Sequence, residues 1–296
     1  MAIAACRNAA ARAVRLRRFV SVIAAAIVCE MAFAAACCST RIVSLDGAST
    51  EIISALGAGN DLVGRDDSSY YPPSVSALPS IGYQFTLDAE SILSLHPTLV
   101  IGRSDAKPQA ALDQIRSAGV PLRLITNSPS IAGAEKRMRE IAATLDRKAA
   151  GESLIDAMER SLSALRVRIA ARQHTPRIRA LVLLGVSAGT VFACGPQTGP
   201  GAAIALADAD NALPTMHGCK KLTSEAIMAA NPGAIVVLNA PGASSDRASV
   251  EQLPGVAFTN AGRAHRIVLL DALFVAGFGP REGRALLELF DDLYAR

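Results

Sequence analysis

The chain has 296 residues, of which 51% are hydrophobic and 19% are charged, and its formal net charge at pH 7 is +4. Its length favours two α/β domains over one, and its apolar content excludes a disordered protein. The basic excess belongs to the start of the chain, because residues 1–36 contain five arginines and one acidic residue, Glu30. Without them the formal net charge is zero, which argues against nucleic acid as a partner.

The first 36 residues have the order of a secretory signal, with a basic start, an apolar run and small residues at the end. The alternative is a transmembrane anchor, but the uninterrupted apolar stretch is too short for one and Glu30 interrupts it. We expect cleavage after Ala36, which fits an A-x-A pattern, and export to the periplasm. Cys37 leaves a lipid anchor open as the weaker alternative, because the leucine usual in lipoprotein signals is missing before it.

Strands and helices alternate in the first half of the mature chain. Residues 42–45 form an apolar strand, Ser49 is a candidate cap for the helix that follows, and Gly57 is its stop signal. After a further short helix, residues 99–101 form a buried strand. This order predicts a first lobe, over residues 37–132, with a mostly parallel sheet covered by helices.

The segment 133–172 is expected to link this lobe to a second one. It contains no proline and carries apolar side chains at helical spacing, such as Met138, Ile141 and Leu145. Two interpretations stay open at this point. The segment is either two consecutive helices broken at Gly151 or one long linking helix between two lobes.

Strand and helix patterns alternate again over residues 173–296, the expected second lobe. An internal repeat relates the two lobes. Two similar segments, LDAESILSLHPTLVI and LTSEAIMAANPGAIV, start 135 residues apart and share the pairs Leu87/Leu222, Glu90/Glu225, Ile92/Ile227 and Pro97/Pro232. The favoured α/β architecture therefore has two lobes, each with a mostly parallel sheet and flanking helices, joined by one long bridging helix.

Two cysteines, Cys194 and Cys219, lie well inside the second lobe. An exported compartment would let them pair, but the sequence leaves the pairing open, because it does not give their geometry. No C-x-x-C or Cys/His spacing indicates a zinc site.

Several motifs together resemble one class of transport proteins. They are TEIISALGAG, LVGRDDSSYYP followed by LPSIGY, LDAESILSLHP, LTSEAIMAANPGAIVV, LPGV, RIVLLD and GFGPREG. On these residues the chain, from about Arg41 to its C-terminus, resembles the helix-linked periplasmic substrate-binding proteins of ABC importers. It is most similar to the haem-binding members of haemin uptake systems, because D-x-S-x-Y-P followed by L-P-x-x-G-Y is the haem-specific part.

This resemblance implies that Tyr71, directly before Pro72, ligates the haem iron. Ferric iron is a hard Lewis acid, and tyrosinate is a recognised axial ligand of haem. A free phenol has a pKa of about 10, so binding requires the charge of the iron and a nearby cation to favour the phenolate. Tyr70 is expected to flank the ligand. Tyr83 either contacts the porphyrin or closes the turn at Gly82.

The second lobe departs from the haem-binding pattern. Cys219 stands where relatives have a tyrosine, and the glycine-rich loop lacks the arginine that they often carry there. Lys220 aligns with their basic residue and is a candidate partner for the phenolate or for a propionate, with an exposed lysine as the alternative. His217 is the second candidate for the axial ligand of the iron.

The resemblance also implies a role for Glu90 and Glu225. In this class of importers, one glutamate from each lobe contacts arginines of the permease. Two carboxylates at equivalent places suit a docking surface on which charge steers the encounter. Stabilisation of a helix N-terminus is the other interpretation, and both can hold.

The sequence therefore predicts a monomeric haem carrier, not an enzyme, that delivers haem to an inner-membrane ABC permease. A carrier of cobalamin or ferric siderophores is the alternative within the same class. A secreted hydrolase or phosphate-ester enzyme is the alternative from another class, but residues 195–201 lack the G-K-[ST] ending of a phosphate loop.

Overall fold

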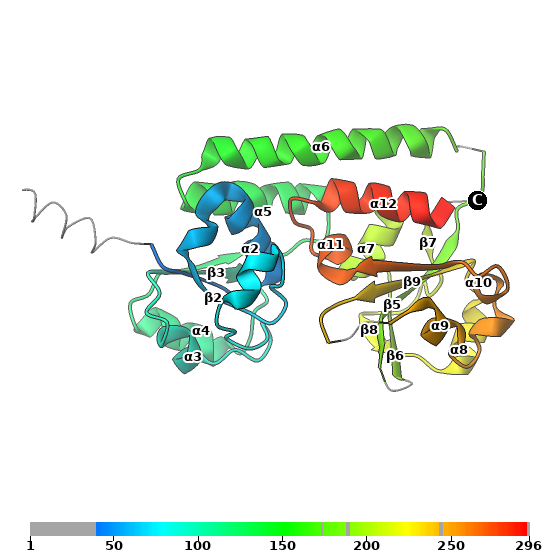
Figure 1. Cartoon of the computed structure of the whole chain (residues 1–296), viewed down its shortest axis with the longest axis horizontal. Helices are drawn as coiled ribbons and strands as arrows, with labels where there is room; N and C mark the ends of the chain where they lie inside the picture. The colour runs from blue at the N-terminus through cyan, green and yellow to red at the C-terminus, as the bar shows by residue number, and fades with distance from the viewer. Residues whose placement is uncertain (1–39, 173, 188–189, 243–244, 295–296) are drawn as a thin grey trace, which may run out of the picture. The chain divides into compact units, whose positions relative to one another are not determined.

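A computed structural model of the chain describes residues 40–172, 174–187, 190–242 and 245–294 (Figure 1). The signal predicted over residues 1–36, with its cleavage site and Cys37, lies outside the described residues. The chain from Arg41 onward forms one compact unit. In its described part, no helix is both long and apolar enough to cross a membrane.

The first lobe contains a parallel sheet in the order β2-β1-β3-β4. Its strands are β1 (Ile42–Ser44), β2 (Leu62–Arg65), β3 (Leu99–Arg103) and β4 (Leu122–Ile125). The helices between them are α2 (Gly47–Ile53), α3 (Ala89–Leu93) and α4 (Gln109–Ser117), with short turns η1 (Ser54–Ala58), η2 (Gly59–Asp61) and η3 (Pro73–Ala77). The central strands are buried on both faces, which explains why they read as continuous apolar runs.

The second lobe contains a mixed sheet in the order β10-β9-β5-β6-β8, with β7 beside β5. Strands β5, β7, β9 and β10 pair in parallel, whereas β6 and β8 pair antiparallel at one edge. The strands are β5 (Arg179–Ser187), β6 (Thr190–Cys194), β7 (Asp210–Asn211), β8 (Cys219–Lys221), β9 (Ala234–Asn239) and β10 (Ile267–Asp271). The helices are α7 (Gly199–Leu206), α8 (Ser224–Ala230), α9 (Arg247–Glu251), η4 (Val256–Phe258), α10 (Asn260–Arg263), α11 (Ala272–Ala276) and α12 (Glu282–Tyr294).

The linking segment is two helices, α5 (Ile131–Thr144) and α6 (Lys148–Ala170), so one helix over 133–172 is wrong. The break lies near Asp146, whose φ of +55° is left-handed, and not at Gly151. Gly151 lies inside α6, where a Cβ atom would come within 2.5 Å of the Cβ of Ala142 on α5. Gly151 therefore allows the two helices to pack closely.

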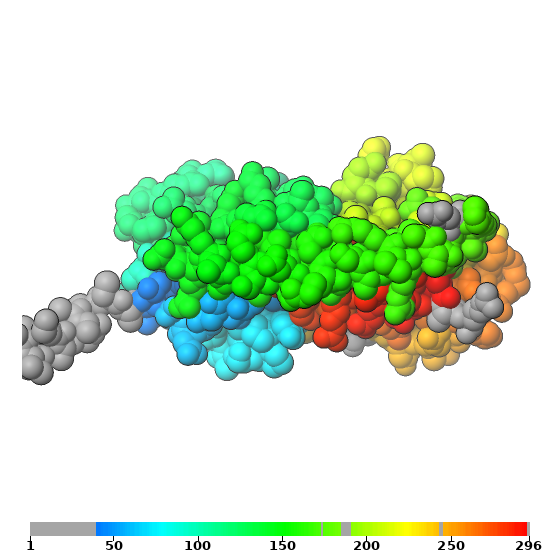
Figure 2. All heavy atoms as spheres, turned by 90° about the horizontal axis from the view of Figure 1, so that it is seen from above, coloured from blue at the N-terminus to red at the C-terminus, as the bar shows by residue number. Residues whose placement is uncertain are grey.

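The predicted long helix that joins the lobes is α6, with 23 residues. It packs on α5, which itself packs on α2 of the first lobe, and on α12 in the second lobe. Figure 2 shows α6 (green) extending across the face of the molecule seen there. A Cβ atom on Gly283 of α12 would lie 2.3 Å from the carbonyl oxygen of Met158 on α6, so this glycine permits the close approach. One apolar core continues from α2 through α5 and α6 to α12. The lobes therefore share a core along α6.

The cap of α2 differs from the prediction. Asp46, not Ser49, is the N-cap residue, because the helix begins at Gly47. The Asp46 carboxylate accepts hydrogen bonds from the backbone N–H of Ser49 at 2.9 Å and from its hydroxyl at 2.7 Å. Gly57 has a φ of +79° in the turn that ends this helical stretch, as its stop role predicts.

Candidate functional site

A cavity of about 930 Å³ lies between the two lobes. Its volume is within the range of pockets that bury small-molecule ligands. The first-lobe wall is mainly aromatic or charged, with Tyr70, Tyr83, Phe85, Arg103, Asp105 and Arg137 among its side chains. The second-lobe wall is mainly small or apolar, with Leu184, Gly199, Pro200, Cys219, Ala272 and Ala276.

Tyr83 and Phe85 form the aromatic part of the first-lobe wall. Their rings meet edge to face with centroids 5.4 Å apart, and they are 44% and 38% exposed. The guanidinium carbon of Arg103, the last residue of β3, lies 5.5 Å from the ring centroid of Phe85. Arg103 also donates to both carboxylate oxygens of Asp105, at 2.5 and 2.7 Å. The carboxyl end of this parallel strand therefore offers apolar ring surface beside a fixed cation.

Arg137, on α5, brings a buried guanidinium to the same cavity. The residue is 3% exposed. It donates to the side-chain oxygen of Asn127 and, at 3.1 Å, to the carbonyl oxygen of Gly277 in the second lobe. Burial lowers the pKa of Arg137, but an arginine side chain stays protonated in proteins. The cavity therefore has a positive charge whose hydrogen-bond partners are neutral.

A disulfide between Cys194 and Cys219 holds the second-lobe wall, with an S–S distance of 2.08 Å. It joins β6 to the short edge strand β8. The next residue, Gly195, is close to the chain opposite, where a Cβ atom would lie 1.8 Å from the carbonyl oxygen of Met216. Backbone and a disulfide shape this wall, and none of its described lining residues is charged.

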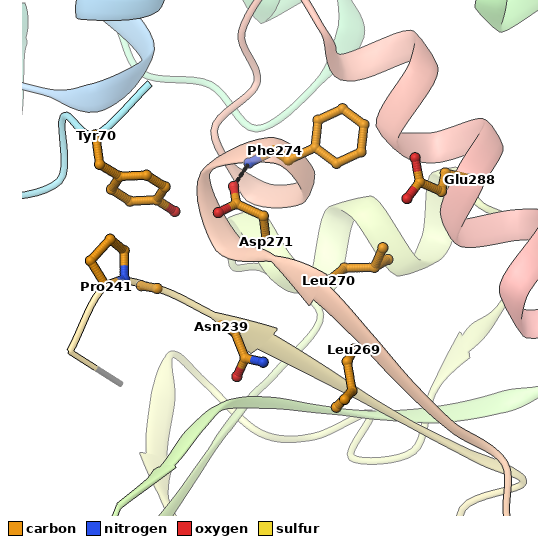
Figure 3. A pocket seen from close by; sticks show the side chains of 9 residues that line it. Tyr70, Asn239, Pro241, Leu269, Leu270, Asp271, Phe274 and Glu288 are labelled. Carbon is orange, nitrogen blue, oxygen red and sulfur yellow. Dashed lines mark hydrogen bonds between the residues drawn. The ribbon is translucent and has the colours of Figure 1, made fainter. Parts of the chain in front are cut away.

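Tyr70 joins the lobes beside a smaller cavity of about 540 Å³ (Figure 3). Its hydroxyl oxygen accepts a 2.9 Å hydrogen bond from the backbone N–H of Leu273 at the start of α11. Burial raises the pKa of Tyr70 well above its ordinary value, and the nearby carboxylate of Asp271 raises it further. Asp271 itself accepts from the backbone N–H of Phe274, at 2.7 Å. Tyr70 is therefore a protonated phenol that ties the lobes together.

Tyr71 has a different environment. It is 37% exposed, and the guanidinium carbon of Arg281 lies 3.5 Å from its ring centroid. Arg281 donates to both carboxylate oxygens of Glu51 on α2, at 2.6 and 2.9 Å. Tyr71 is not among the lining residues of either cavity. Its partner Arg281 also lies 4.9 Å from the ring centroid of Phe274, which lines the smaller cavity.

Asp66 fixes the start of the tyrosine segment. Its carboxylate accepts from the hydroxyl of Ser69 at 2.5 Å, and from the hydroxyl and N–H of Ser68 at 2.7 and 3.1 Å. Asp66 is 0% exposed, and burial raises its pKa to about 6 against the opposing effect of these bonds. The hydrogen bonds to the buried Asp66 carboxylate thus fix the turn that leads to Tyr71.

The two halves of the D-x-S-x-Y-P and L-P-x-x-G-Y motif meet at Asp67. Its carboxylate accepts from the hydroxyl of Ser80 at 2.5 Å, and its backbone N–H donates to the carbonyl oxygen of Gly82 at 3.0 Å. The motif therefore has a physical basis. These bonds place Tyr83 next to the turn that presents Tyr71.

The predicted site residues have different locations. Tyr83 lines the larger cavity, whereas Lys220 and His217 do not. Lys220 is the central residue of β8, and its neighbour Cys219 lines the cavity. Because side chains alternate along a strand, Lys220 lies on the opposite face from Cys219. This orientation argues against the ligand contact that the sequence predicts for Lys220, whereas the contact of His217 stays a prediction.

Three arginines that the sequence analysis did not select lie at these cavities or next to Tyr71. Arg281 belongs to GFGPREG, one of the motifs of the resemblance, so its signal was present. Arg103 lies two residues after the strand predicted over 99–101 and ends the observed strand β3, and the carboxyl ends of parallel strands are where such sheets place ligand contacts. Arg137 gave no signal, because an arginine in an amphipathic helix is usually solvated. In the described part of the chain, no cluster of three or more His, Cys, Asp or Glu residues could hold a metal ion.

A model of the periplasmic binding protein family matches residues 42–273. The chain belongs to this family. Curated relatives include an uncharacterised ABC transporter substrate-binding lipoprotein, YvrC of Bacillus subtilis, 26% identical over 86% of this chain and 80% of that protein. The vitamin B12-binding protein of Yersinia pestis is 34% identical, but over only 28% of this chain and 29% of that protein.

Solved structures of this family agree over most of the chain. The periplasmic haem-binding protein RhuT from Roseiflexus sp. RS-1, in its apo form, is 40% identical, with a TM-score of 0.80 over 87% of this chain and 98% of that one. The haem-binding protein BhuT in complex with two haems is 34% identical, with a TM-score of 0.79 over 86% and 98%. A periplasmic haem-binding protein from Pseudomonas aeruginosa is 33% identical, with a TM-score of 0.79 over 86% and 92%.

Glu90 and Glu225 occupy matching places in the two lobes of this binding protein. Each is the second residue of a short helix, α3 or α8, and each is exposed. The caps are Asp88 and Thr223, one residue before each helix. Hydrogen bonds from its own backbone N–H, Thr223 and Ser224 lower the pKa of Glu225. In Figure 1 both helices lie on the side of the molecule away from α6.

Proposed function

We propose that this periplasmic binding protein is an exported haem carrier that binds ferric haem between its lobes and delivers it to an inner-membrane ABC importer. The contact between Tyr71 and Arg281 carries the proposal. A solvent-accessible phenol beside a cation is the arrangement that a hard ferric iron needs from an oxygen ligand. The identity with solved haem-binding proteins over most of the chain supports the same ligand.

The proposal assigns a separate role in haem binding to each residue around the tyrosine segment. Tyr71 ligates the iron through its phenolate oxygen, and Arg281 favours that charge. The exposed rings of Tyr83 and Phe85 contact the porphyrin, whose large flat surface suits aromatic partners. Tyr70 does not ligate, because its hydroxyl is occupied by Leu273 and its buried environment favours the protonated form.

Titration with ferric haemin, followed by absorbance, tests this function. The wild-type protein should give a saturable Soret change and a tyrosinate-to-iron charge-transfer band. Tyr71→Phe should lose that band and bind haemin at least about 10-fold more weakly, because it loses a metal–ligand bond. Tyr70→Phe, the matched control, should keep the band. An unchanged band in Tyr71→Phe would disprove the assignment, and His217→Ala would then be measured.

A cobalamin carrier is the second candidate, favoured by the partial match to vitamin B12-binding proteins. That match covers only 28% of this chain. The same titration with cyanocobalamin discriminates the two, because a corrinoid needs no tyrosinate. Saturable cobalamin binding without haemin binding would replace the proposal.

We also propose that Glu90 and Glu225 dock the protein on its permease. Two exposed carboxylates at equivalent positions complement two cationic sites on a partner with two-fold symmetry. Each also lies in the first turn of a helix, where a carboxylate is favourable in any case. Docking and helix stabilisation therefore make different predictions for transport.

ATPase stimulation separates these roles, using the haemin importer of the same organism in lipid nanodiscs. Glu90→Ala and Glu225→Ala should each reduce stimulation, by about 10-fold for a charge pair lost from an interface. Haemin affinity should not change. Asp156→Ala, an exposed carboxylate on α6, is the control and should stimulate normally. Full stimulation by both glutamate variants would disprove docking.

Several remaining assignments belong to the same proposal. The protein is exported, acts as a monomer and is not an enzyme. Its segments are the signal (1–36), the first lobe (37–132), the linking segment (133–172) and the second lobe (173–296).

Residues 185–189, GVSAG, match the G-x-S-x-G spacing of a hydrolase. A nucleophile elbow joins a strand to a helix, whereas β5 is followed by the antiparallel strand β6. This context argues against a hydrolase.

A further inference from the structure

The buried guanidinium of Arg137 has no role in the proposed function so far. We propose that Arg137 and Asn127 form a subsite for a carboxylate group of the ligand. For haem this group is a propionate, so the inference rests on the proposed function and adds what the cavity recognises. It follows from the burial, the hydrogen bonds and the charges around Arg137.

Arg137 has no ion-pair partner among the described residues, although it is 3% exposed. Its described acceptors are the side-chain oxygen of Asn127 and the carbonyl oxygen of Gly277. A buried charge is unfavourable unless a counter-charge and hydrogen bonds compensate for it. Because Arg137 lines a cavity, a ligand can bring that counter-charge.

The acidic groups around Arg137 form hydrogen bonds with other residues or are buried. Asp105 is paired with Arg103 through two hydrogen bonds. Asp46 uses its carboxylate to cap α2 through Ser49. Glu282 is fully buried, which raises its pKa well above its ordinary value, and it forms no ion pair with Arg137. These acidic groups act on Arg137 only at longer range, and none of them forms an ion pair with it.

Asn127 completes the geometry. Its side-chain oxygen accepts from Arg137, which orients the amide group and leaves the amide nitrogen as a donor. That nitrogen has no acceptor among the described residues, and Asn127 lines the same cavity as Arg137. An arginine and an amide side by side present several N–H donors to the two oxygens of one carboxylate.

This subsite distinguishes ligands that have similar ring systems. Haem carries two propionates, whereas the peripheral side chains of cobalamin end in amides. A guanidinium without a counter-ion favours the acid, because an amide supplies hydrogen-bond acceptors but no charge. The subsite also spans the lobes through Gly277, so a carboxylate bound there would contact the seam between them.

Binding of ferric haemin and of its dimethyl ester tests the inference. The two ligands share the iron and the ring, but the ester has no carboxylate. The full-length mature protein should bind haemin about 10- to 100-fold more tightly than the ester, in the range of a charge-assisted hydrogen bond. In Arg137→Met this ratio should fall to about one, mostly through weaker haemin binding. Arg137→Lys should recover part of the ratio, and Arg123→Met, an exposed arginine on β4, should keep it.

Equal affinities of the wild-type protein for haemin and the ester would overturn the carboxylate subsite and leave the haem function intact. This comparison needs no substitution, so a variant that fails to fold does not affect it. A parallel loss of both ligands in Arg137→Met would also overturn the subsite, since it would mark a purely structural arginine. Wild-type protein that binds neither ligand would overturn both proposals. A tyrosinate band together with equal affinities for haemin and the ester would overturn the subsite alone.

Discussion

The two walls of the cavity differ in chemistry although the lobes share a repeat. The first-lobe wall carries Tyr83, Phe85, Arg103 and Arg137, whereas the described lining of the second lobe has no charged residue. The second lobe instead contributes glycines, alanines and the disulfide of Cys219. A sequence repeat shared by the two lobes therefore does not imply equivalent contacts. One lobe supplies most of the recognition and the other supplies shape.

Arg281 connects the two lobes, although it lines neither cavity. It comes from the second lobe, but its partners, Glu51 and Tyr71, belong to the first. Tyr70 makes a second link in the opposite direction, to Leu273. The segment around α11 therefore determines how the second lobe acts on a site that is otherwise built by the first.

The largest effect on haemin affinity is expected from Arg281, because it is the second-lobe group placed directly against Tyr71, the candidate ligand of the iron. Arg281→Met should weaken haemin binding by about 10- to 100-fold, the range for losing one charge-assisted interaction. Lys220→Met, which removes the other candidate cation, should change affinity by less than about 2-fold, since it lies on the face of β8 away from the cavity. Absorbance titration of both variants measures this. A stronger effect from Lys220 would reverse the assignment.

The disulfide between Cys194 and Cys219 tests whether the second-lobe wall contributes shape alone. The double variant Cys194→Ser, Cys219→Ser should lower the free energy of unfolding by about 3 kcal/mol, as expected for a loop of this length. Haemin affinity should fall by only a few-fold, because the wall gives shape rather than charge. Urea unfolding and haemin titration on the same samples test both parts. A complete loss of haemin binding in a folded variant would show that the second lobe contributes more than shape.

The last prediction concerns the pH dependence of stability and the segment before Tyr71. The pKa of Asp66 is raised from 3.8 to about 6 in the folded protein, so its contribution to stability is present below about pH 4 and is lost as the pH rises through 6. Between about pH 4 and pH 7 this group should lower the free energy of unfolding by up to about 3 kcal/mol. Urea unfolding of Asp66→Asn should have a shallower pH dependence than the wild type. Identical slopes would contradict this role for Asp66.

Much of the fold could be predicted from the sequence because its signals are local. Alternating strands and helices gave the parallel first sheet, and the 135-residue repeat located Glu90 and Glu225 on equivalent helices. The cap of α2 was misassigned because aspartate and serine are both good caps, and the true start depends on where the helix packs. The antiparallel edge of β6 and β8 gave no periodic signal, since both strands are short.

The sequence by itself determined the class of fold, the repeat and the tyrosine segment, because hydrophobic spacing and motif order are properties of neighbouring residues. Only the tertiary structure decided which charges meet. Arg281 and Glu51 are 230 residues apart, and Arg137 and Gly277 are 140 apart, so no local pattern pairs them. The break near Asp146 also depends on packing, since Gly151 is tolerated inside α6 where the helix must approach Ala142. Contacts between distant segments depend on how the lobes pack together, and that packing distinguishes Tyr71 from Tyr70.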